Sequence, residues 1–233
     1  MDNVSINYNM NSNHYPRERR ETNERDKTMK VLLLNGSPHA DGSIYTALSE
    51  MIRVFEKEGI ETELIHVGHM DIRGCTACNA CMKLGRCVYE DVVNEVAAKL
   101  EQADGLVVGS PVYFASANAT IVALLDRLFF SAHFDMRMKV GAAVASARRG
   151  GLTATFDELN KYFTISGMPV ASGQYWNGIH GNSAAEAVQD REGMQMMRTL
   201  ASNMSFLMKS IALGREKYGL PEREAPQMMN FIH

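Results

Sequence analysis

A continuous apolar run that is followed at once by a helical pattern most constrains this chain. The segment MKVLLLNGSP begins at Met29 and ends in Gly-Ser-Pro. Such a run is typical of a strand that is buried on both faces of a parallel sheet. Beyond it, apolar residues recur at helical spacing from Ile44 to Phe55, and Gly59 follows where a helix C-cap is expected. The order predicts a strand and then a helix.

This alternation continues along the chain. Further strands are expected at 61–67, 105–111, 139–146 and 168–173, and further helices at 91–100, 118–130, about 152–163 and about 189–213. Five short strands that alternate with helices predict an α/β fold with a doubly wound parallel sheet. Such sheets bind ligands beyond the carboxyl ends of their strands, where the strand order reverses. The Met-rich last helix is expected to pack on the core or on another subunit.

The chain divides into one domain with a tail at each end. Residues 1–28 are Asn-rich and then charged, without a hydrophobic period, so we expect a disordered N-terminal tail. Residues 29–213 form the expected domain, and 214–233 a C-terminal tail. The composition, with 45% hydrophobic and 22% charged residues, is that of a globular protein with an ample core.

Charge and hydropathy exclude several classes of partner. The net charge is -3 and no basic stripe is present, which argues against a nucleic-acid partner. The sequence shows neither a signal-peptide-like apolar segment nor a run of roughly 18 apolar residues, so no membrane partner is expected. We predict a cytoplasmic protein, a compartment in which clustered cysteines more often bind metal or carry out redox chemistry.

The loop after the first strand, GSPHADGS at 36–43, leads directly into a helix. Backbone N–H groups at the helix start, the hydroxyls of Ser37 and Ser43 and the imidazole of His39 could together bind a phosphate. The loop matches neither G-x-x-x-x-G-K-[ST] nor G-x-G-x-x-G, so a terminal monophosphate such as that of FMN fits better than a triphosphate or a dinucleotide. The alternative is a turn whose Gly and Pro only shape the backbone.

Two further loops follow later strands. In SPVYFASANA, which begins at Ser110, Pro111 stiffens the turn, and Tyr113 and Phe114 place aromatic surface where a flat heterocycle would lie. In ASARRGG, from Ala145, paired glycines allow close backbone approach, and an arginine could bind a carbonyl or an anionic ring edge. Each loop taken alone could serve packing only, but three such loops at one sheet edge favour a ligand site.

These loops, together with AVQDREGM at 187–194, resemble the matching segments of the iron-sulfur flavoproteins, within the flavodoxin-like NADPH-dependent FMN reductase superfamily. The resemblance covers about residues 30–213. It implies a flavodoxin-like fold with strand order 2-1-3-4-5, FMN as cofactor, and subunits that associate around the flavin sites as a homodimer or homotetramer. The residues that it assigns to FMN are Ser37, His39 and Ser43 at the phosphate, Pro111, Val112, Tyr113 and Phe114 at the ring system, and Arg148, Gly150 and Gly151 at the opposite ring edge.

Two positions depart from the pattern of that family. His39 stands where the family usually has Arg, and Ile44 where it usually has Thr. One permanent positive charge and one hydroxyl are thereby missing from the expected phosphate site.

All four cysteines lie in GCTACNACMKLGRC, at the spacing C-x2-C-x2-C-x5-C. The resembling flavoproteins carry a compact motif of this kind that binds a 4Fe-4S cluster, and a local C-x2-C-x2-C run can supply three thiolates to one centre. The ligands so implied are Cys75, Cys78, Cys81 and Cys87. Two alternatives stay open: a reduced cysteine loop beside the flavin without metal, and a zinc site, for which a longer insert between two C-x2-C pairs is usual.

Two functions are expected from this reading. In the first, NAD(P)H is the co-substrate of an FMN oxidoreductase that passes electrons to a small-molecule or protein acceptor, with no side chain needed as acid or base. The electrons leave singly if the cluster is present; without it the enzyme is an FMN or quinone-type reductase that passes them as a pair to a quinone-like or other small acceptor. In the second, the chain is a flavodoxin-like electron shuttle that does not turn over NAD(P)H.

Overall fold

The structure is a computed structural model, and it describes residues 28–225 and 227. The expected disordered tail, except for Thr28, lies outside the described residues. In chain order the elements are β1 (Lys30–Asn35), α1 (Ser43–Lys57), β2 (Glu61–His66), α2 (Cys81–Leu84), α3 (Val92–Gln102), β3 (Gly105–Tyr113), β4 (Ser116–Ala117), α4 (Ala119–Ser131), β5 (Val140–Ala147), α5 (Leu152–Ile165), β6 (Gly178–His180), α6 (Ala184–Ala187) and α7 (Arg191–Tyr218).

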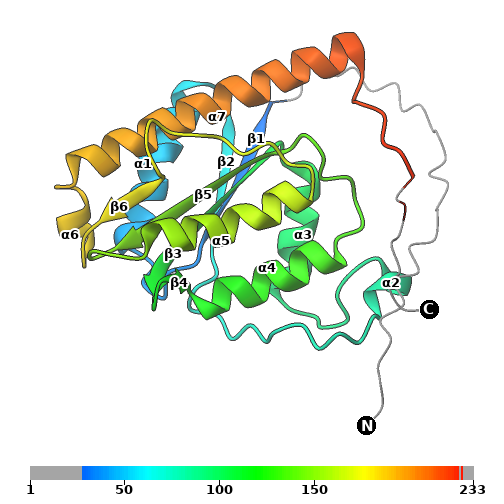
Figure 1. Ribbon diagram of the computed structural model, residues 1–233, viewed down its shortest axis with the longest axis horizontal. Coiled ribbons are helices and arrows are strands. Elements are labelled where there is room, and N and C mark those ends of the chain that lie inside the picture. Colours follow the sequence, from blue (N-terminus) through cyan, green and yellow to red (C-terminus); the bar gives the residue numbers. More distant parts are fainter. Residues whose placement is uncertain (1–27, 226, 228–233) are drawn as a thin grey trace.

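Five parallel strands form the sheet in the order β2-β1-β3-β5-β6, and the short β4 pairs antiparallel to β3. Helices cover both faces, with α1, α6 and α7 on one side and α3, α4 and α5 on the other (Figure 1). The order reverses at β1, because the chain goes from β1 to β2 on one side and returns to β3 on the other. The prediction of a flavodoxin-like, doubly wound sheet is confirmed.

The apolar run of β1 explains how the two helical layers are held. Val31 and Leu33 belong to the cluster beneath α1 and α7, whereas Leu32 and Leu34 belong to the cluster beneath α3 and α4. All four side chains are completely buried. The run is continuous because both faces of this strand are core.

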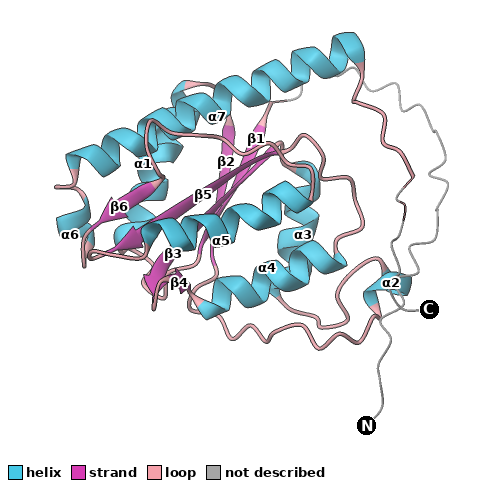
Figure 2. Cartoon of the chain, viewed as in Figure 1, coloured by secondary structure: helices cyan, strands magenta, loops and turns pink. Residues whose placement is uncertain are grey.

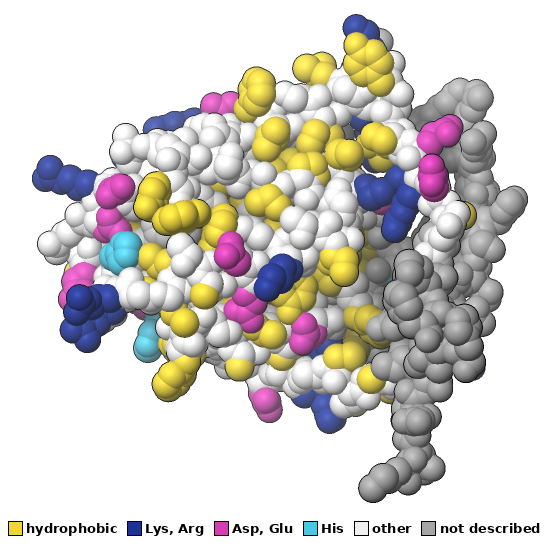
Figure 3. Space-filling view, viewed as in Figure 1, with side chains coloured by type: hydrophobic (Ala, Val, Ile, Leu, Met, Phe, Trp, Pro, Cys, Tyr) yellow, Lys and Arg dark blue, Asp and Glu magenta, His cyan; other side chains and the backbone are white. Residues whose placement is uncertain are grey.

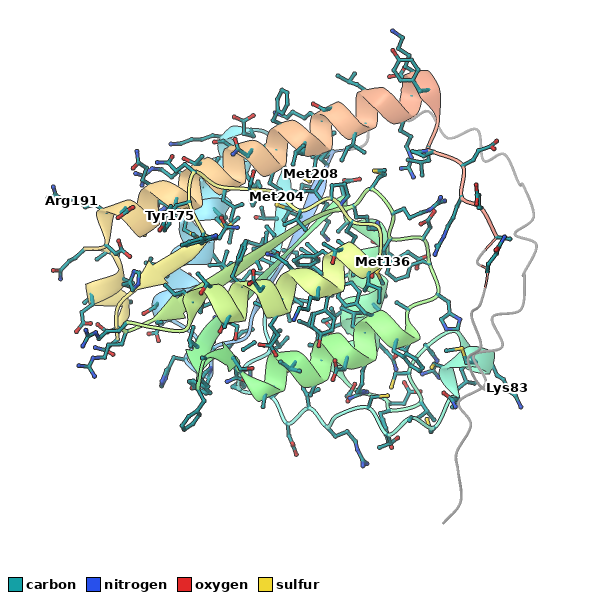
Figure 4. The ribbon with its side chains drawn as sticks, viewed as in Figure 1. Lys83, Met136, Tyr175, Arg191, Met204 and Met208 are labelled. Atoms are coloured by element: carbon teal, nitrogen blue, oxygen red, sulfur yellow. The ribbon has the colours of Figure 1, made fainter. Side chains whose placement is uncertain are left out.

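The Met-rich helix α7 packs on the sheet. A Cβ atom on Gly105 would lie 2.4 Å from Cε of Met204 and 3.0 Å from the sulfur of Met208, so β3 needs glycine at this point. Figure 4 shows both methionines on the side of α7 that faces the sheet. The helix ends at Tyr218, past the expected end near residue 213. Of the two expected roles, a place in the core is confirmed.

The prediction of a fifth strand at 168–173 is wrong in position. This segment forms only an isolated bridge between Val170 and Gly141, in which Gly141 N donates to Pro169 O at 2.8 Å and Ala171 N donates to Gly141 O at 2.8 Å. The chain then leaves the sheet, and the regular strand β6 pairs with the last residues of β5. Because proline has no N–H to donate, it shortens the pairing at its own position.

Within the described part of the chain, no helix combines the length and the apolar character that a membrane crossing requires.

Candidate functional site

The loop between β1 and α1 is shaped by its own polar side chains. Oδ1 of Asn35 accepts a hydrogen bond from Ser37 N at 3.0 Å, and Nδ2 of Asn35 donates to Ala40 O at 3.3 Å. The hydroxyl oxygen of Ser37 accepts from His39 N at 3.1 Å. Ser37 is buried and His39 is exposed. Ser37 therefore holds the loop in place, while the His39 side chain remains accessible to a ligand.

The first turn of α1 offers N–H groups to an anion. Its N-cap is Gly42, and no described side chain caps this helix end. A Cβ atom on Gly42 would lie 3.2 Å from Cβ of His39, so the histidine side chain begins beside the helix start. The Ser43 hydroxyl donates its proton to Gly181 O at 3.1 Å, so it can donate to a phosphate only after it rotates away from this carbonyl. Uncapped N–H groups and the helix dipole favour a phosphate at this position.

The loop after β3 is a hairpin. Phe114, in the turn, has a φ of 52° and is fully exposed, and Tyr113 is 46% exposed. The carboxylate of Glu158, on α5, accepts hydrogen bonds from the Ser116 hydroxyl at 2.9 Å and from Ala117 N at 2.7 Å. A half-buried anchor thus holds an aromatic tip that lacks internal packing, as expected for a surface that contacts a ring.

The loop after β5 packs against this hairpin. Arg148 and Gly150 are exposed, and Gly151 begins α5 with a φ of 94°. A Cβ atom on Gly151 would lie 2.7 Å from Cγ1 of Val112 and 2.9 Å from Cα of Ala115. The positive φ and this close approach both require glycine.

The structure therefore brings the three predicted loops to one sheet edge. β1 and β3 are neighbours, and Gly36 N donates to Gly109 O at 2.8 Å across the point where the strand order reverses. An uncapped helix start, an exposed aromatic tip and a glycine rim fit the phosphate and the ring of FMN.

The four cysteines line one small cavity of about 20 Å³. Cys75 and Cys78 are exposed, whereas Cys81 and Cys87 are buried. Burial raises the pKa of Cys81, and the neighbouring Cys78 and Cys75 raise it further, since a thiolate there would be poorly solvated and close to other negative charge.

Residues with left-handed backbone conformation bend the cysteine segment, whose four cysteines line the same cavity. Ala77 and Asn79 have φ values of 52° and 55°, and Gly85 ends α2 at 67°. Asn94 fixes the far end of the segment, because its side chain accepts from Cys87 N at 3.0 Å and donates to Cys87 O at 3.1 Å.

Arg127 is the charged residue at the wall of this cavity, and its side chain is only 1% exposed. It donates to both carboxylate oxygens of Asp91, at 2.6 and 2.9 Å, and to Sγ of Cys87, at 3.2 and 3.3 Å. Burial disfavours its charge, yet the hydrogen bonds from Arg127 to Asp91 and Cys87 hold the pKa of Arg127 above its ordinary value. Sequence reasoning missed this residue. A signal was available, since Leu124, Arg127 and Leu128 share the buried face of α4.

The four thiols are the ligand type that an iron-sulfur cluster needs, but their positions in the structure are not those of a formed metal site. Four thiols face one cavity, and the buried Ser131 hydroxyl at its wall has no hydrogen-bond partner among the described residues. The described residues nevertheless contain no group of three or more His, Cys, Asp or Glu side chains arranged to hold a metal. Ligation by all four cysteines therefore stays a prediction.

The cysteine loop does not lie beside the three loops at the sheet edge. Its cavity is lined by Phe130 and Ser131 at the end of α4, whereas the aromatic hairpin precedes the start of α4. The 13 residues of α4 span about 20 Å. Figure 2 shows α2 at the end of the molecule opposite β4 and β6. Within one chain the cysteine loop thus lies apart from the three loops, and a reduced cysteine loop without metal stays an alternative.

Comparisons with known proteins identify the family to which the chain belongs. The family described as NADPH-dependent FMN reductase matches residues 29–182. An iron-sulfur flavoprotein of Methanocaldococcus jannaschii is 32% identical over 78% of this chain and 99% of its own length. An iron-sulfur flavoprotein of Methanosarcina thermophila is 31% identical over 81% of this chain and 100% of its own.

Solved structures show the same fold at low identity. RosB, with a bound formylated riboflavin phosphate intermediate, superposes with a TM-score of 0.63 at 17% identity, over 88% of this chain and 92% of its own. An archaeal flavodoxin gives a TM-score of 0.54 at 14% identity, over 78% of this chain and 99% of its own.

Proposed function

Because the chain belongs to the iron-sulfur flavoproteins of the NADPH-dependent FMN reductase family, we propose that it is a flavin oxidoreductase that oxidises NAD(P)H through FMN and carries a 4Fe-4S cluster. FMN, when bound, accepts a hydride and releases electrons singly or in pairs, and a cluster relays single electrons. The observation that carries the FMN assignment is the uncapped start of α1 beside two loops that meet at the switch point of the sheet.

The chain's own residues position the flavin. N–H groups at the start of α1 and the side chain of His39 bind the phosphate, the Ser43 hydroxyl joins them when it turns from Gly181 O to the phosphate, and Ser37 holds the loop. Tyr113 and Phe114 cover one side of the ring, and the glycine rim at 150–151 allows the backbone to approach the other edge. No side chain is needed to move a proton, so we assign no catalytic residue.

The four cysteines hold the cluster in this proposal. Arg127 faces Cys87 with two N–H groups, which compensate negative charge on the sulfur, and Asp91 fixes the orientation of the guanidinium. The support comes from the thiol donor set around one cavity and from the names of the relatives.

The separation of the two sites supports an oligomer. With the length of α4 between them, a cysteine loop that receives electrons from a flavin would need the flavin of a second copy close by. A homodimer or homotetramer that places the cysteine end of one subunit near the sheet edge of another would meet this need. The final acceptor is a small molecule or a protein.

Steady-state oxidation of NADH and NADPH with a dye acceptor tests the enzyme directly. Turnover by the FMN-loaded protein alone is expected. A protein that binds FMN and accepts electrons from a separate reductase, yet shows no turnover with either nucleotide, is an electron shuttle instead.

A further inference from the structure

Histidine side chains gather at the carboxyl edge of the sheet. Four of them lie at or just after the ends of strands: His39 after β1, His66 and His69 at β2, and His180 at β6. Figure 3 shows histidine side chains at the end of the molecule that carries β6. The proposed function assigns a role to His39 alone.

His66 makes a direct contact with the loop at 36–43. Its Nε2 atom lies 2.7 Å from the carbonyl oxygen of Ser37. Because a carbonyl oxygen only accepts, Nε2 carries the proton and donates, in the neutral ring and in the charged ring alike. The bond is partly buried, so its loss would leave the Ser37 carbonyl poorly solvated and the loop less firmly held.

The sheet fixes the position from which His66 donates. His66 is the last residue of β2 and pairs in register with Asn35, the last residue of β1. Val67 N and Gly68 N both donate to Asn35 O, at 2.9 and 3.1 Å. A Cβ atom on Gly68 would lie 2.2 Å from Ser37 O, so the chain beyond β2 lies directly against the loop and requires glycine there.

The ring of His69 packs against the ring of His66. The two ring centroids lie 4.3 Å apart, and the planes are inclined by 31°. His69 is exposed, and within the described part of the chain only His66 of this pair bonds to the loop. His69 therefore touches the donor ring without sharing its contact with Ser37.

Ser37 links His66 to the groups that face the phosphate. Its N–H donates to Oδ1 of Asn35 at 3.0 Å, its hydroxyl oxygen accepts from His39 N at 3.1 Å, and its carbonyl accepts from His66. His39 and the uncapped start of α1 follow it closely along the chain. A shift of Ser37 would move these donors relative to a bound phosphate, and such hydrogen bonds weaken steeply with misalignment.

We propose that His66 is a positioning residue for the flavin phosphate. Through the carbonyl of Ser37 it holds the loop at 36–43 in the conformation that binds a terminal monophosphate, and it does not touch the phosphate itself. The inference rests on the proposed function, because FMN is the ligand. It concerns the phosphate alone, so binding of the flavin ring beside Tyr113 and Phe114 should not depend on His66.

The ratio of the affinities for FMN and riboflavin isolates this role, since the two ligands differ only in the phosphate. Full-length protein freed of flavin is titrated with each ligand, and quenching of flavin fluorescence gives the two dissociation constants. His66→Leu removes the donor and should lower the preference for FMN over riboflavin about tenfold, with the riboflavin affinity unchanged. His66→Gln retains an N–H donor at a similar reach and should keep most of the preference.

His69→Leu is the matched control, because it removes the neighbouring ring and leaves the donor in place. It should change the preference less than about twofold. Melting temperatures are read on the same samples. A folded His66→Leu protein with unchanged preference overturns the proposal. Equal losses for FMN and riboflavin overturn it as well, as does the same selective loss in His69→Leu.

If His66→Leu does not fold, His66→Gln and His66→Asn decide. The Asn amide is one methylene shorter and does not reach Ser37 O, so His66→Asn should lose the preference that His66→Gln keeps. Equal preference in these two variants overturns the role of His66. Failure of the proposed function is seen separately, as a wild-type protein that binds neither flavin.

Discussion

Arg127 donates two hydrogen bonds to the sulfur of Cys87, from Nε at 3.3 Å and from Nη2 at 3.2 Å. The same guanidinium is held by both carboxylate oxygens of Asp91, which also caps α3 by accepting from Val93 N at 3.1 Å. One buried cation thus joins the end of α4, the start of α3 and the cysteine segment.

Replacing Arg127 should change both stability and redox behaviour. Arg127→Leu leaves Asp91 unpaired, so we expect a loss of about 2 kcal/mol in unfolding free energy. It also removes N–H donors from a cluster thiolate, which should lower the cluster's midpoint potential. Urea unfolding and a redox titration measure the two effects. Arg127→Lys should retain part of each effect, and Arg191→Leu, at the exposed first residue of α7, should change neither. An unaltered potential in a folded, cluster-loaded Arg127→Leu protein would contradict this role.

His39 should make FMN binding depend on pH. Its side chain starts beside the N-terminus of α1, where the phosphate is proposed to bind. Protonated imidazole attracts phosphate, so affinity should fall as pH rises through the range in which histidines lose their proton. FMN titrations between about pH 5.5 and 8.5 measure this. His39→Arg should bind FMN equally across the range, and a pH-independent wild type would exclude the contribution of His39.

Glu50 should stabilise the protein above acidic pH by joining α1 to α7. Its carboxylate accepts from Arg198 at 2.7 Å and from Arg53 at 2.9 Å. Burial acts to raise the pKa of Glu50, but these hydrogen bonds outweigh it and the pKa lies below its ordinary value. Since the folded pKa is depressed, the contribution is present above the unfolded pKa and is lost as pH falls through the folded one.

We therefore expect Glu50→Gln to cost about 1 to 2 kcal/mol at pH 7, and this difference should shrink below about pH 4. The matched control is Glu58→Gln, because Glu58 pairs with Lys209 between the same two helices but both side chains are 43% exposed. That control should cost less than about 0.5 kcal/mol. Unfolding of each variant at both pH values checks the prediction, and equal costs at the two sites would contradict it.

Removing residues 1–28 should leave fold and flavin intact. They lack the apolar surface that would offset the entropy of ordering them, and β1 begins only at Lys30. A truncated protein that starts at Met29 should retain its FMN and its melting temperature. A loss of either would show that the segment packs on the domain or on a neighbouring subunit.

Local pattern was sufficient for the parts of the fold that are set by burial. The apolar run at 30–35 predicted β1, and the helical spacing after Ile44 predicted α1. Both patterns follow directly from which side chains are buried: both faces of β1 and one face of α1. The hairpin at Phe114 was not foreseen, since its turn lacks the usual Gly or Asn and its anchor, Glu158, lies on a distant helix. The segment around Val170 forms only one bridge to β5, at Gly141. The length of this pairing depends on how the neighbouring chain segments share the edge of β5, which local sequence does not encode.

The site was predicted in its parts but not in its arrangement. The three loops could be read from strand ends, because parallel strands finish at one edge. The course of the cysteine segment away from that edge, and the burial of Arg127 beside Cys87, depend on tertiary contacts that spacing does not encode.

Substitution of single cysteines should separate the two proposed cofactors. Replacing Cys75, Cys78, Cys81 or Cys87 with Ser weakens a thiolate ligand and should reduce the broad visible absorption beneath the flavin bands. FMN should stay bound, because its loops lie at the other end of α4. Transfer to a one-electron acceptor should slow, while reduction of FMN by NAD(P)H should change little. Unaltered spectra in all four variants would contradict the assignment of these ligands.

The absorption spectrum of anaerobically purified protein, with flavin, iron and acid-labile sulfide quantified on the same sample, tests the central claim most directly. We expect about one FMN, four iron and four sulfide per chain, as one flavin and one cubane cluster require. Flavin bands without stoichiometric iron would contradict the cluster, and protein that binds no FMN even after incubation with it would contradict the account as a whole.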